Sequence, residues 1–299
     1  MRGPALLTLK TTTYKMIRLK QKSPYLYLLP AVFLVLGAEL VPVIYTTYLG
    51  FTRWDIIHKP HWIGLRNYIR IFSAPELLNA LQNTLIWVIG TLIFPVGLAL
   101  ALAVLINRIK MRALFKAIFF IPTTLSPTVA GIIWRRVLAT QKGAVNSILT
   151  AFGLSPYAML TDSPLNTFLM IGAWTWQFLG LNLILFLVGL ETVPKEPIEA
   201  AKVDGANSWQ VFRYVTLPLL RPITMVVLAN AIINTVRMFD IPWIMTKGGP
   251  GRASETLAIS LYRESFLLFH MGLGSAIAVV ISILTLILAW RFLRALTTT

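Results

Sequence analysis

The stretch that decides the fold runs over residues 165–218 and joins an apolar segment to a polar one. Residues 165–190 read LNTFLMIGAWTWQFLGLNLILFLVGL without a charged side chain, and residues 191–218 read ETVPKEPIEAAKVDGANSWQVFRYVTLP. Because about 20 apolar residues cross a bilayer as a helix, the first part predicts a membrane span. The second part predicts a structured loop at the membrane surface, with another span beginning at Leu217.

The composition of the whole chain is that of a membrane protein. Hydrophobic residues make up 57% and charged residues 13%, and the mean hydropathy is +0.73. A soluble domain carries about a quarter charged residues. The net charge of +16 lies in short tracts beside apolar runs and not on a face with exposed aromatics, so it indicates the membrane surface and no nucleic acid. The absence of cysteine excludes disulfides and thiolate metal sites.

Six stretches are long and apolar enough to span a bilayer, so we expect an all-α integral membrane protein with six transmembrane helices. Residues 1–24 are basic and polar and lack the apolar core of a cleavable signal peptide. We expect them to be a tail and residues 25–299 to be one transmembrane domain. Prolines inside several stretches are tolerated where helices surround a cavity. The six stretches are 26–49, 81–106, 117–138, 165–190, 217–239 and 273–296.

The distribution of Lys and Arg predicts the orientation. Six spans put both termini on one side, together with the 107–116 and 191–216 loops, and these segments hold more Lys and Arg than the loops on the other side. Since positively charged loops stay in the cytoplasm, we expect cytoplasmic termini in the inner membrane of a bacterium or archaeon. The polar loop between spans 4 and 5 then also faces the cytoplasm.

The polar loop, about residues 191–218, predicts two short helices around a turn. Pro194 and Pro197 favour a helix start, and Glu196 and Glu199 would lie in its first turn. Gly205 permits a sharp turn. Trp209, Phe212 and Val215 then recur at helical spacing. Taken alone, this pattern is typical of an amphipathic helix at the membrane surface.

The longer spacing in this loop matches a family motif. Glu199-Ala200-Ala201, Gly205 and Leu217-Pro218 resemble the EAA loop of binding-protein-dependent ABC importer permeases, with Val215 in place of the usual Ile. The resemblance implies that this segment, with Asp204, is a coupling helix that docks into a separate ATPase. The sequence has no GxxxxGK[ST] phosphate loop. We therefore expect no cofactor in this chain, with ATP and Mg bound by the partner.

Further motifs over most of the chain resemble those of MalF-like, or UgpA-like, subunits of carbohydrate importers. This resemblance implies the type I importer (MetI-like) fold, a second MalG-like permease, two ATPase copies, an extracytoplasmic sugar-binding protein and alternating access. Maltose-type members carry extra N-terminal spans and a periplasmic insertion that this sequence does not show, so maltose specificity does not carry over. The motifs are Trp62-Ile63-Gly64-Leu65-x-Asn67-Tyr68, Gly143-x-x-Asn146, and Phe239-Asp240 with Thr246-x-Gly248-Gly249-Pro250.

Polar side chains inside spans are costly and are candidates for a pathway. Amide and aromatic side chains suit a sugar, and the resemblance places Thr175, Gln177, Asn182, Thr235 and Met238 at sugar-lining positions. Helix–helix hydrogen bonding is the alternative for each, and Arg237 could simply pair with Asp240. Glu39, in the first span, has no assignable partner. The candidate pathway residues are Trp174, Thr175, Gln177, Asn182, Asn234, Thr235, Arg237, Met238 and Asp240.

The Gly248-Gly249-Pro250 turn is either a plain external loop or, from the resemblance, a contact for the binding protein. Two other functions stay open. The first is a permease for glycerol phosphates or another polar solute on the same scaffold. The second is a membrane-embedded enzyme, although no nucleophile and base stand out. His58-x-x-His61 lacks a convincing third metal ligand, so we expect no metal site.

Overall fold

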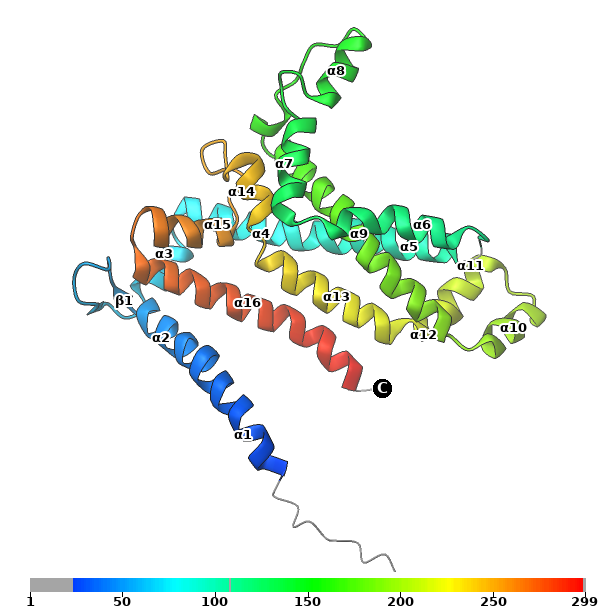
Figure 1. Ribbon diagram of the computed structural model, residues 1–299, viewed down its shortest axis with the longest axis horizontal. Coiled ribbons are helices and arrows are strands. Elements are labelled where there is room, and N and C mark those ends of the chain that lie inside the picture. Colours follow the sequence, from blue (N-terminus) through cyan, green and yellow to red (C-terminus); the bar gives the residue numbers. More distant parts are fainter. Residues whose placement is uncertain (1–23, 108, 298–299) are drawn as a thin grey trace, which may run out of the picture. The chain divides into compact units, whose positions relative to one another are not determined.

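The computed structural model describes residues 24–107 and 109–297, which fold almost entirely into helices (Figure 1). Most of the expected tail, residues 1–23, lies outside the described residues. The elements are α1 (Pro24–Val35), η1 (Leu36–Leu40), α2 (Val41–Gly50), β1 (Thr52–Arg53), β2 (His61–Trp62), α3 (Arg66–Ile71), α4 (Pro75–Thr91), η2 (Leu92–Val96), α5 (Gly97–Ile106), α6 (Arg112–Phe120), η3 (Ile121–Thr124), α7 (Pro127–Val137), α8 (Ala144–Ala151), η4 (Met159–Thr161), α9 (Leu165–Thr192), α10 (Lys195–Val203), α11 (Ser208–Val211), η5 (Phe212–Thr216), α12 (Leu217–Leu219), α13 (Arg221–Val236), α14 (Asp240–Thr246), α15 (Leu257–Tyr262), η6 (Arg263–Leu267) and α16 (Met271–Thr297).

Four helical stretches are long and apolar enough to cross a membrane, which makes the chain a multi-pass membrane protein. Four of the predicted spans coincide with these stretches. The other two predicted spans are each a pair of helices bent at a short break, so the described residues hold up to six spans if each bent pair counts as one. The four stretches are Tyr27–Gly50, Pro75–Ile106, Leu165–Thr192 and Met271–Trp290.

The chain divides into two compact units, residues 1–45 and 46–299. The described part of the first unit is helical and includes Pro30 and a π-helical turn, η1, that contains Glu39. The boundary falls within α2, and the second unit holds all the elements that follow it. Within it, η2 is a further π-helical turn and contains Pro95. Pro95 has no N–H to donate to the α-helical hydrogen-bond pattern, and single π-helical turns occur as bulges inside α-helices.

The third predicted span, 117–138, is bent by 97° between Arg112–Thr124 and Pro127–Val137. Pro127 forces the residues before it into an extended conformation, and Leu125 and Ser126 have ψ angles of 147° and 150°. The Ser126 hydroxyl then accepts a hydrogen bond from the Val129 N–H and caps α7. The third predicted span is therefore a bent pair of helices, and it remains a prediction that the pair crosses the membrane as one span.

The fifth predicted span, 217–239, is bent by 71° between Ser208–Leu219 and Arg221–Val236. Pro218 and Pro222 lie on either side of the bend, where Leu220 has a ψ angle of −4°. The apolar helix that follows, α13, ends at Val236, before the predicted limit. The Leu217-Pro218 pair therefore begins a short helical turn on the loop side of the bend and not the long helix itself.

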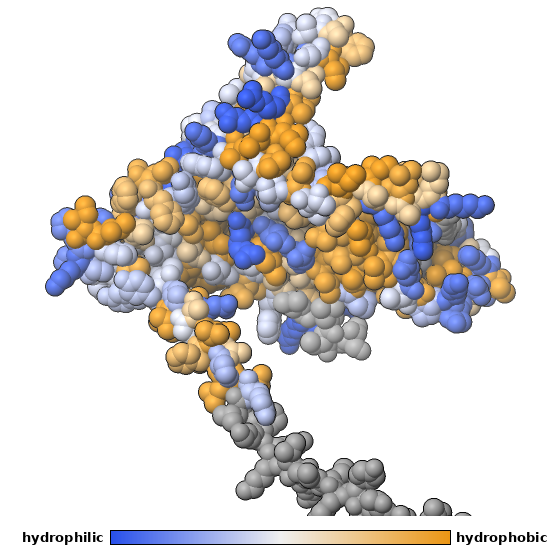
Figure 2. All heavy atoms as spheres, in the orientation of Figure 1, coloured by the Kyte–Doolittle hydropathy of each residue, from blue (hydrophilic) through white to orange (hydrophobic). Residues whose placement is uncertain are grey.

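The long helix α9 lies at the centre of the second unit, where it packs against α4, α5, α6, α7 and α13. Three buried apolar clusters surround it or its neighbours. One joins α4, α13 and α16 around Ile232 and Ile277. The second surrounds Trp87 and Trp174, and the third contains Phe186. Broad apolar surfaces remain on the outside (Figure 2), as expected for helices whose solvent is lipid.

Two asparagines of the family-like motifs fix loops to the helical bundle. The Asn67 amide donates to the carbonyls of Gly50 and Thr52, at 2.9 and 2.8 Å, and so holds the short β1–β2 hairpin. The Asn146 amide donates to the carbonyls of Ala139 and Tyr157. These motif residues therefore satisfy buried backbone groups, as a folded loop requires.

Candidate functional site

The 191–218 loop forms two short helices joined by a turn at Gly205, as predicted. Helix α10 runs over Lys195–Val203, and Glu196 lies in its first turn while Glu199 falls one turn later than expected. Gly205 has a φ of +84°, a left-handed conformation that glycine adopts without strain. Helix α11 begins at a capping box in which Asn207 and Gln210 each bond the other's backbone N–H.

This loop presents most of its predicted coupling residues to the outside. Glu199, Ala200, Asp204, Gly205 and Pro218 are exposed, whereas Ala201 and Leu217 are half-buried. Ala201, Asp204 and Gly205 line one shallow hollow of about 340 Å³ together with Gln210, Tyr214 and Val215. The structure therefore brings three of the predicted residues together.

Large apolar side chains are also exposed on the loop. Val203 is 88% exposed, Tyr214 73% and Trp209 68%. A groove of about 1010 Å³ lies between α10–α11 and the apolar residues of α5 and the end of α9. Helix α10 packs mainly on α11 and η5. An exposed apolar patch beside a polar hollow is typical of a protein–protein contact.

Six of the nine predicted pathway residues lie buried inside the chain. The Thr175 and Thr235 hydroxyls bond to carbonyls of their own helices, those of Ile171 and Ala231. Trp174 stacks on Phe178 with ring centroids 3.9 Å apart, and Met238 lies in the same apolar cluster as Trp174. Asn182 is buried further along α9.

Gln177 is buried for a specific structural reason. Its side-chain amide N–H donates to the Leu125 carbonyl at 2.8 Å, and its backbone carbonyl accepts from the Thr123 hydroxyl at 2.7 Å. Both contacts provide hydrogen-bond partners for polar groups at the break in the third predicted span. One turn along, a Cβ at Gly180 would lie 2.1 Å from the Phe119 carbonyl oxygen. The bent segment therefore packs against this face of α9. For Gln177 this is the helix–helix hydrogen bonding that was the alternative to a role in the pathway.

The other three predicted pathway residues lie on the outer face of the unit. Arg237 is exposed, and Asn234 and Asp240 are half-buried. Figure 2 shows hydrophilic residues in the middle of this face, where α13 and α14 meet in Figure 1, between apolar surfaces. The possible Arg237–Asp240 pair does not form, because α13 ends before Arg237 and α14 begins at Asp240. Arg237 instead bonds the Ile233 carbonyl, and Asp240 accepts from Thr128.

The Gly248-Gly249-Pro250 turn is held in place by hydrogen bonds from two helices. Asn83 on α4 donates to the carbonyls of Ala253 and Glu255, and Asn79 donates to that of Arg252. Asn166 on α9 reaches the Gly249 carbonyl at 3.0 Å. Gly248 has a φ of +82°, and a Cβ there would lie 3.2 Å from the Cβ of Glu255. This 247–256 loop is therefore fixed to the bundle.

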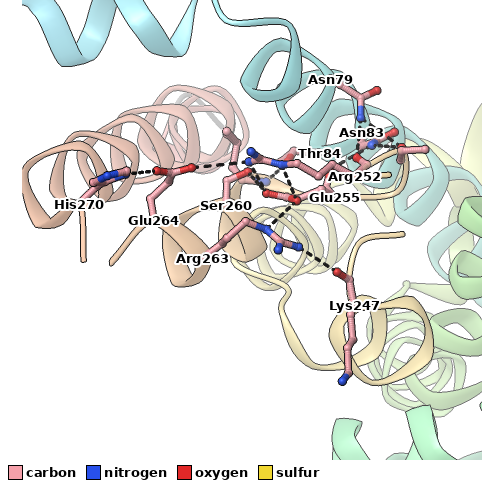
Figure 3. Close-up of polar contacts among 12 residues, drawn as sticks. Asn79, Asn83, Thr84, Lys247, Arg252, Glu255, Ser260, Arg263, Glu264 and His270 are labelled. Atoms are coloured by element: carbon pink, nitrogen blue, oxygen red, sulfur yellow. Dashed lines mark hydrogen bonds and ion pairs between the residues drawn. The ribbon is translucent and has the colours of Figure 1, made fainter. Parts of the chain in front are cut away.

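A buried charge network closes the 247–256 loop onto α15 and η6 (Figure 3). Glu255 is fully buried and accepts two hydrogen bonds from Arg252, at 2.7 and 2.9 Å. Arg263 and Ser260 donate to the same carboxylate. The network continues through Glu264, 3.8 Å from Arg252 and hydrogen-bonded to His270.

The pKa of Arg252 shows how strong this pairing is. Burial alone would lower the pKa of the guanidinium, but the hydrogen bonds and charge of Glu255, with a further contribution from Glu264, raise it above its ordinary value. A buried charge of this kind is stable only because it is paired and hydrogen-bonded on both sides. The Arg252–Glu255 pair is therefore a structural element of the loop.

Sequence reasoning missed this network and the asparagines that serve it. Glu255 is separated from Asn83 by 172 residues, so no local pattern joins them. A usable signal was nevertheless present. Arg252, Glu255 and Arg263 are charges close together in a chain with few charges, and Asn79 and Asn83 are one helical turn apart.

The fold and these sites define a class: a multi-pass membrane protein with an exposed two-helix loop suited to a protein partner. The family of the binding-protein-dependent transport system inner membrane component matches over residues 93–297. The chain belongs to this family, so it is a membrane subunit of a transporter and not an enzyme.

Curated relatives match over nearly their whole length. The arabinooligosaccharides transport system permease protein AraP of Bacillus subtilis (strain 168) is 36% identical over 90% of this chain and 87% of its own. The osmoprotective compounds uptake permease protein GgtC of Synechocystis is 32% identical over 87% of this chain and 93% of its own.

A solved structure shares the fold. It is a chain of a bacterial ABC transporter involved in the import of the acidic polysaccharide alginate, and it matches with a TM-score of 0.79. The match covers 92% of this chain and 94% of that chain at 22% sequence identity. At this identity the likeness concerns the fold alone, which is that of an importer permease.

Proposed function

We propose that this chain is a permease subunit of an ATP-driven sugar importer and forms half of its translocation pathway. The observation that carries the proposal is the exposed α10–Gly205–α11 loop on a membrane protein whose sequence has no phosphate-binding loop of its own. Relatives whose names assign them to arabinooligosaccharide transport support a sugar as the cargo. The cargo is then a mono-, di- or oligosaccharide, with a trehalose or α-glucoside type among the candidates.

The 191–218 loop would transmit the conformational change of the ATPase to the membrane helices. Glu199, Asp204 and the exposed apolar residues would contact the ATPase, and Ala200 and Ala201 would let its surface come close. Gly205 provides the turn between the two short helices. Leu217 and Pro218 lie at the start of the 71° bend, so they would pass movement of the loop on to α13. Two ATPase copies would supply ATP and Mg.

The orientation follows from this docking. The loop and both termini would face the cytoplasm in a six-span arrangement in which each bent pair crosses the membrane. The 247–256 loop would then lie outside, where Gly248, Gly249 and Pro250 would face the extracytoplasmic binding protein. A rigid loop suits this role, since a fixed surface loses little entropy when it binds.

The solute pathway would lie along the outer face with Asn234, Arg237 and Asp240, completed by a second, MalG-like permease. This face is polar between apolar surfaces in the isolated chain, and polar groups at membrane depth need such a cavity. Closure of the ATPases would move the loops and so switch the cavity from facing one side of the membrane to facing the other. This is an alternating-access cycle between two states. Trp174, Thr175, Gln177, Asn182, Thr235 and Met238 would support the helices behind it.

The exposed guanidinium of Arg237 is the observation that favours a second candidate, a permease for glycerol phosphates or another anionic solute. Uptake and ATPase activity of the reconstituted importer, measured across a panel of neutral sugars and phosphorylated solutes, separate the two. Stimulation by a neutral sugar is the expected result. Stimulation only by phosphorylated solutes would sink the sugar assignment, and turnover by this chain without ATPase partners would indicate an enzyme.

A further inference from the structure

A basic bowl of about 890 Å³ lies between the hairpin that follows α2 and the start of α16. The hairpin that follows α2, helix α3, and the segment before α16 form its walls. Arg53, Lys59, Arg66 and Arg70 line it. None of these four forms an ion pair within residues 24–107 and 109–297. They are therefore free to meet a negative charge from outside the chain.

The acid in the bowl does not balance these cations. Asp55 lines it but is already bonded to His58, with the two side chains 2.8 Å apart. The backbone N–H of His58, and then its ring, lower the pKa of Asp55 through hydrogen bonds that favour the charged carboxylate. His270, which also lines the bowl, is bonded to the buried Glu264. Four basic side chains therefore line the bowl with a single carboxylate, which is already hydrogen-bonded to His58.

The walls of the bowl are fixed in place. The Asn67 amide holds the hairpin through the carbonyls of Gly50 and Thr52. Gly272 at the start of α16 lies so close to the hairpin that a Cβ would meet the Thr52 carbonyl oxygen at 2.0 Å. The backbone that carries these cations is therefore already ordered, which lowers the entropy that is lost when an anion binds.

Helix α3 shows what kind of anion would fit. Its buried side carries Asn67 and Ile71, and its exposed Arg66 and Arg70 are one turn apart and line the bowl. Leu65, Ile69 and Phe72 are exposed at 60%, 63% and 55% in and beside the same helix. A helix with a buried side, a basic side and an exposed apolar side is the pattern of an element lying in the membrane interface.

Exposed apolar residues continue around the bowl. Ile57 and Trp62 flank it on the hairpin, and Leu268 and Phe269 precede α16. Figure 2 shows strongly hydrophobic and strongly hydrophilic residues side by side on the segment beside β1. Trp is enriched at the headgroup level of a membrane, and clustered Lys and Arg side chains at a membrane surface attract anionic lipid headgroups. A soluble acidic partner would explain the cations but not this apolar collar.

We propose that this bowl binds the phosphate headgroup of an anionic phospholipid, with the acyl chains on the exposed apolar residues of α3 and the segment before α16. The site is independent of the sugar cargo and of the coupling loop. It would anchor the hairpin and the adjoining ends of α4 and α16 at the membrane surface. Each basic residue near the surface contributes about fivefold in affinity.

Native mass spectrometry of the full chain, purified with its co-purifying subunits, tests this. The probes are phosphatidylglycerol and phosphatidylcholine. We expect selective retention of phosphatidylglycerol, and a loss of about a hundredfold in its affinity in the Arg53→Gln, Arg66→Gln, Arg70→Gln variant. The matched control is Arg135→Gln, Arg136→Gln, Lys142→Gln, which removes the same charge at other exposed positions and should keep the lipid. Arg66→Lys with Arg70→Lys keeps the charge and should also retain it.

Several results would overturn the proposal. Equal retention of both lipids, unchanged retention in the triple Gln variant, or an equal loss in the control would remove the charged-headgroup site. Displacement of the lipid by millimolar inorganic phosphate alone would make it a site for a soluble anion. A triple variant that keeps phosphatidylglycerol but loses affinity for the binding protein would make the bowl a protein contact. Thermal unfolding of each variant verifies that it is folded.

Discussion

The two loops that carry the proposed partners differ in how they are attached to the bundle. The 247–256 loop is closed by a fully buried glutamate with two arginine partners, and Asn83 and Asn166 hold its backbone. The 191–218 loop instead exposes Val203, Trp209 and Tyr214 and is separated from α5 by a groove. The difference teaches that one loop is a surface fixed to the bundle, whereas the other exposes apolar side chains that a partner could cover.

The largest expected difference between the loops is in their glutamates. Glu255→Ala leaves Arg252 and Arg263 without their buried partner and should destabilise the protein by about 3–5 kcal/mol. Glu199→Ala removes an exposed side chain and should change stability by less than about 0.5 kcal/mol, yet reduce transport. Thermal unfolding in detergent and uptake in vesicles measure the two effects. Similar unfolding temperatures for both variants would erase the contrast.

A second contrast compares the stability contributions of two asparagines, one that fixes the 247–256 loop and one that caps a short helix. Asn83→Ala leaves the buried Glu255 carbonyl without its donor and removes one of the two side-chain donors to the Ala253 carbonyl, so it should cost about 1–3 kcal/mol. Asn207→Ala removes only the cap of the short helix α11, worth about 1 kcal/mol. Hydrogen exchange should show lost protection in the 247–256 loop for the first variant and confined to α11 for the second. Unchanged exchange in the 247–256 loop of Asn83→Ala would mean that other contacts hold it.

The smallest expected difference in stability within a pair is between two glycine variants, and this pair separates folding from coupling. Gly205 and Gly153 have φ angles of +84° and +78°, and a Cβ at either would meet no atom within 4 Å. Gly205→Ala and Gly153→Ala should therefore each cost about 1 kcal/mol through backbone strain alone. Only Gly205→Ala should lower solute-stimulated ATPase activity and uptake. Equal transport losses in the two variants would assign the effect to strain and not to the position of the turn.

The features predicted from sequence were those encoded locally. The spans at 165–190 and 273–296 followed from apolar length, and the two-helix form of the 191–218 loop followed from Pro194 and Gly205. Leu125 and Leu220 mark bends that were not predicted. An apolar run with prolines looks the same whether the helix is kinked or sharply broken.

The candidate site was less predictable because its contacts are distant in sequence. Gln177 and Arg237 looked alike as polar residues of spans. In the fold, Gln177 donates a hydrogen bond to the Leu125 carbonyl at the helix break, whereas Arg237 is exposed on the outer face. Glu255 depends on helices that lie more than a hundred residues before it in the chain. Such pairings arise from tertiary packing, which single-residue polarity does not encode.

Cysteine cross-linking tests most directly whether the 191–218 loop, and not the 247–256 loop, contacts the ATPase. The chain has no cysteine, so Val203→Cys and Lys247→Cys each place one thiol on an exposed position of one loop. In membranes that contain the assembled importer, a maleimide-linked photo-cross-linker on residue 203 should capture the ATPase subunit. The same probe on residue 247 should capture the binding protein or nothing. Capture of the ATPase from residue 247, with none from residue 203, would contradict the account.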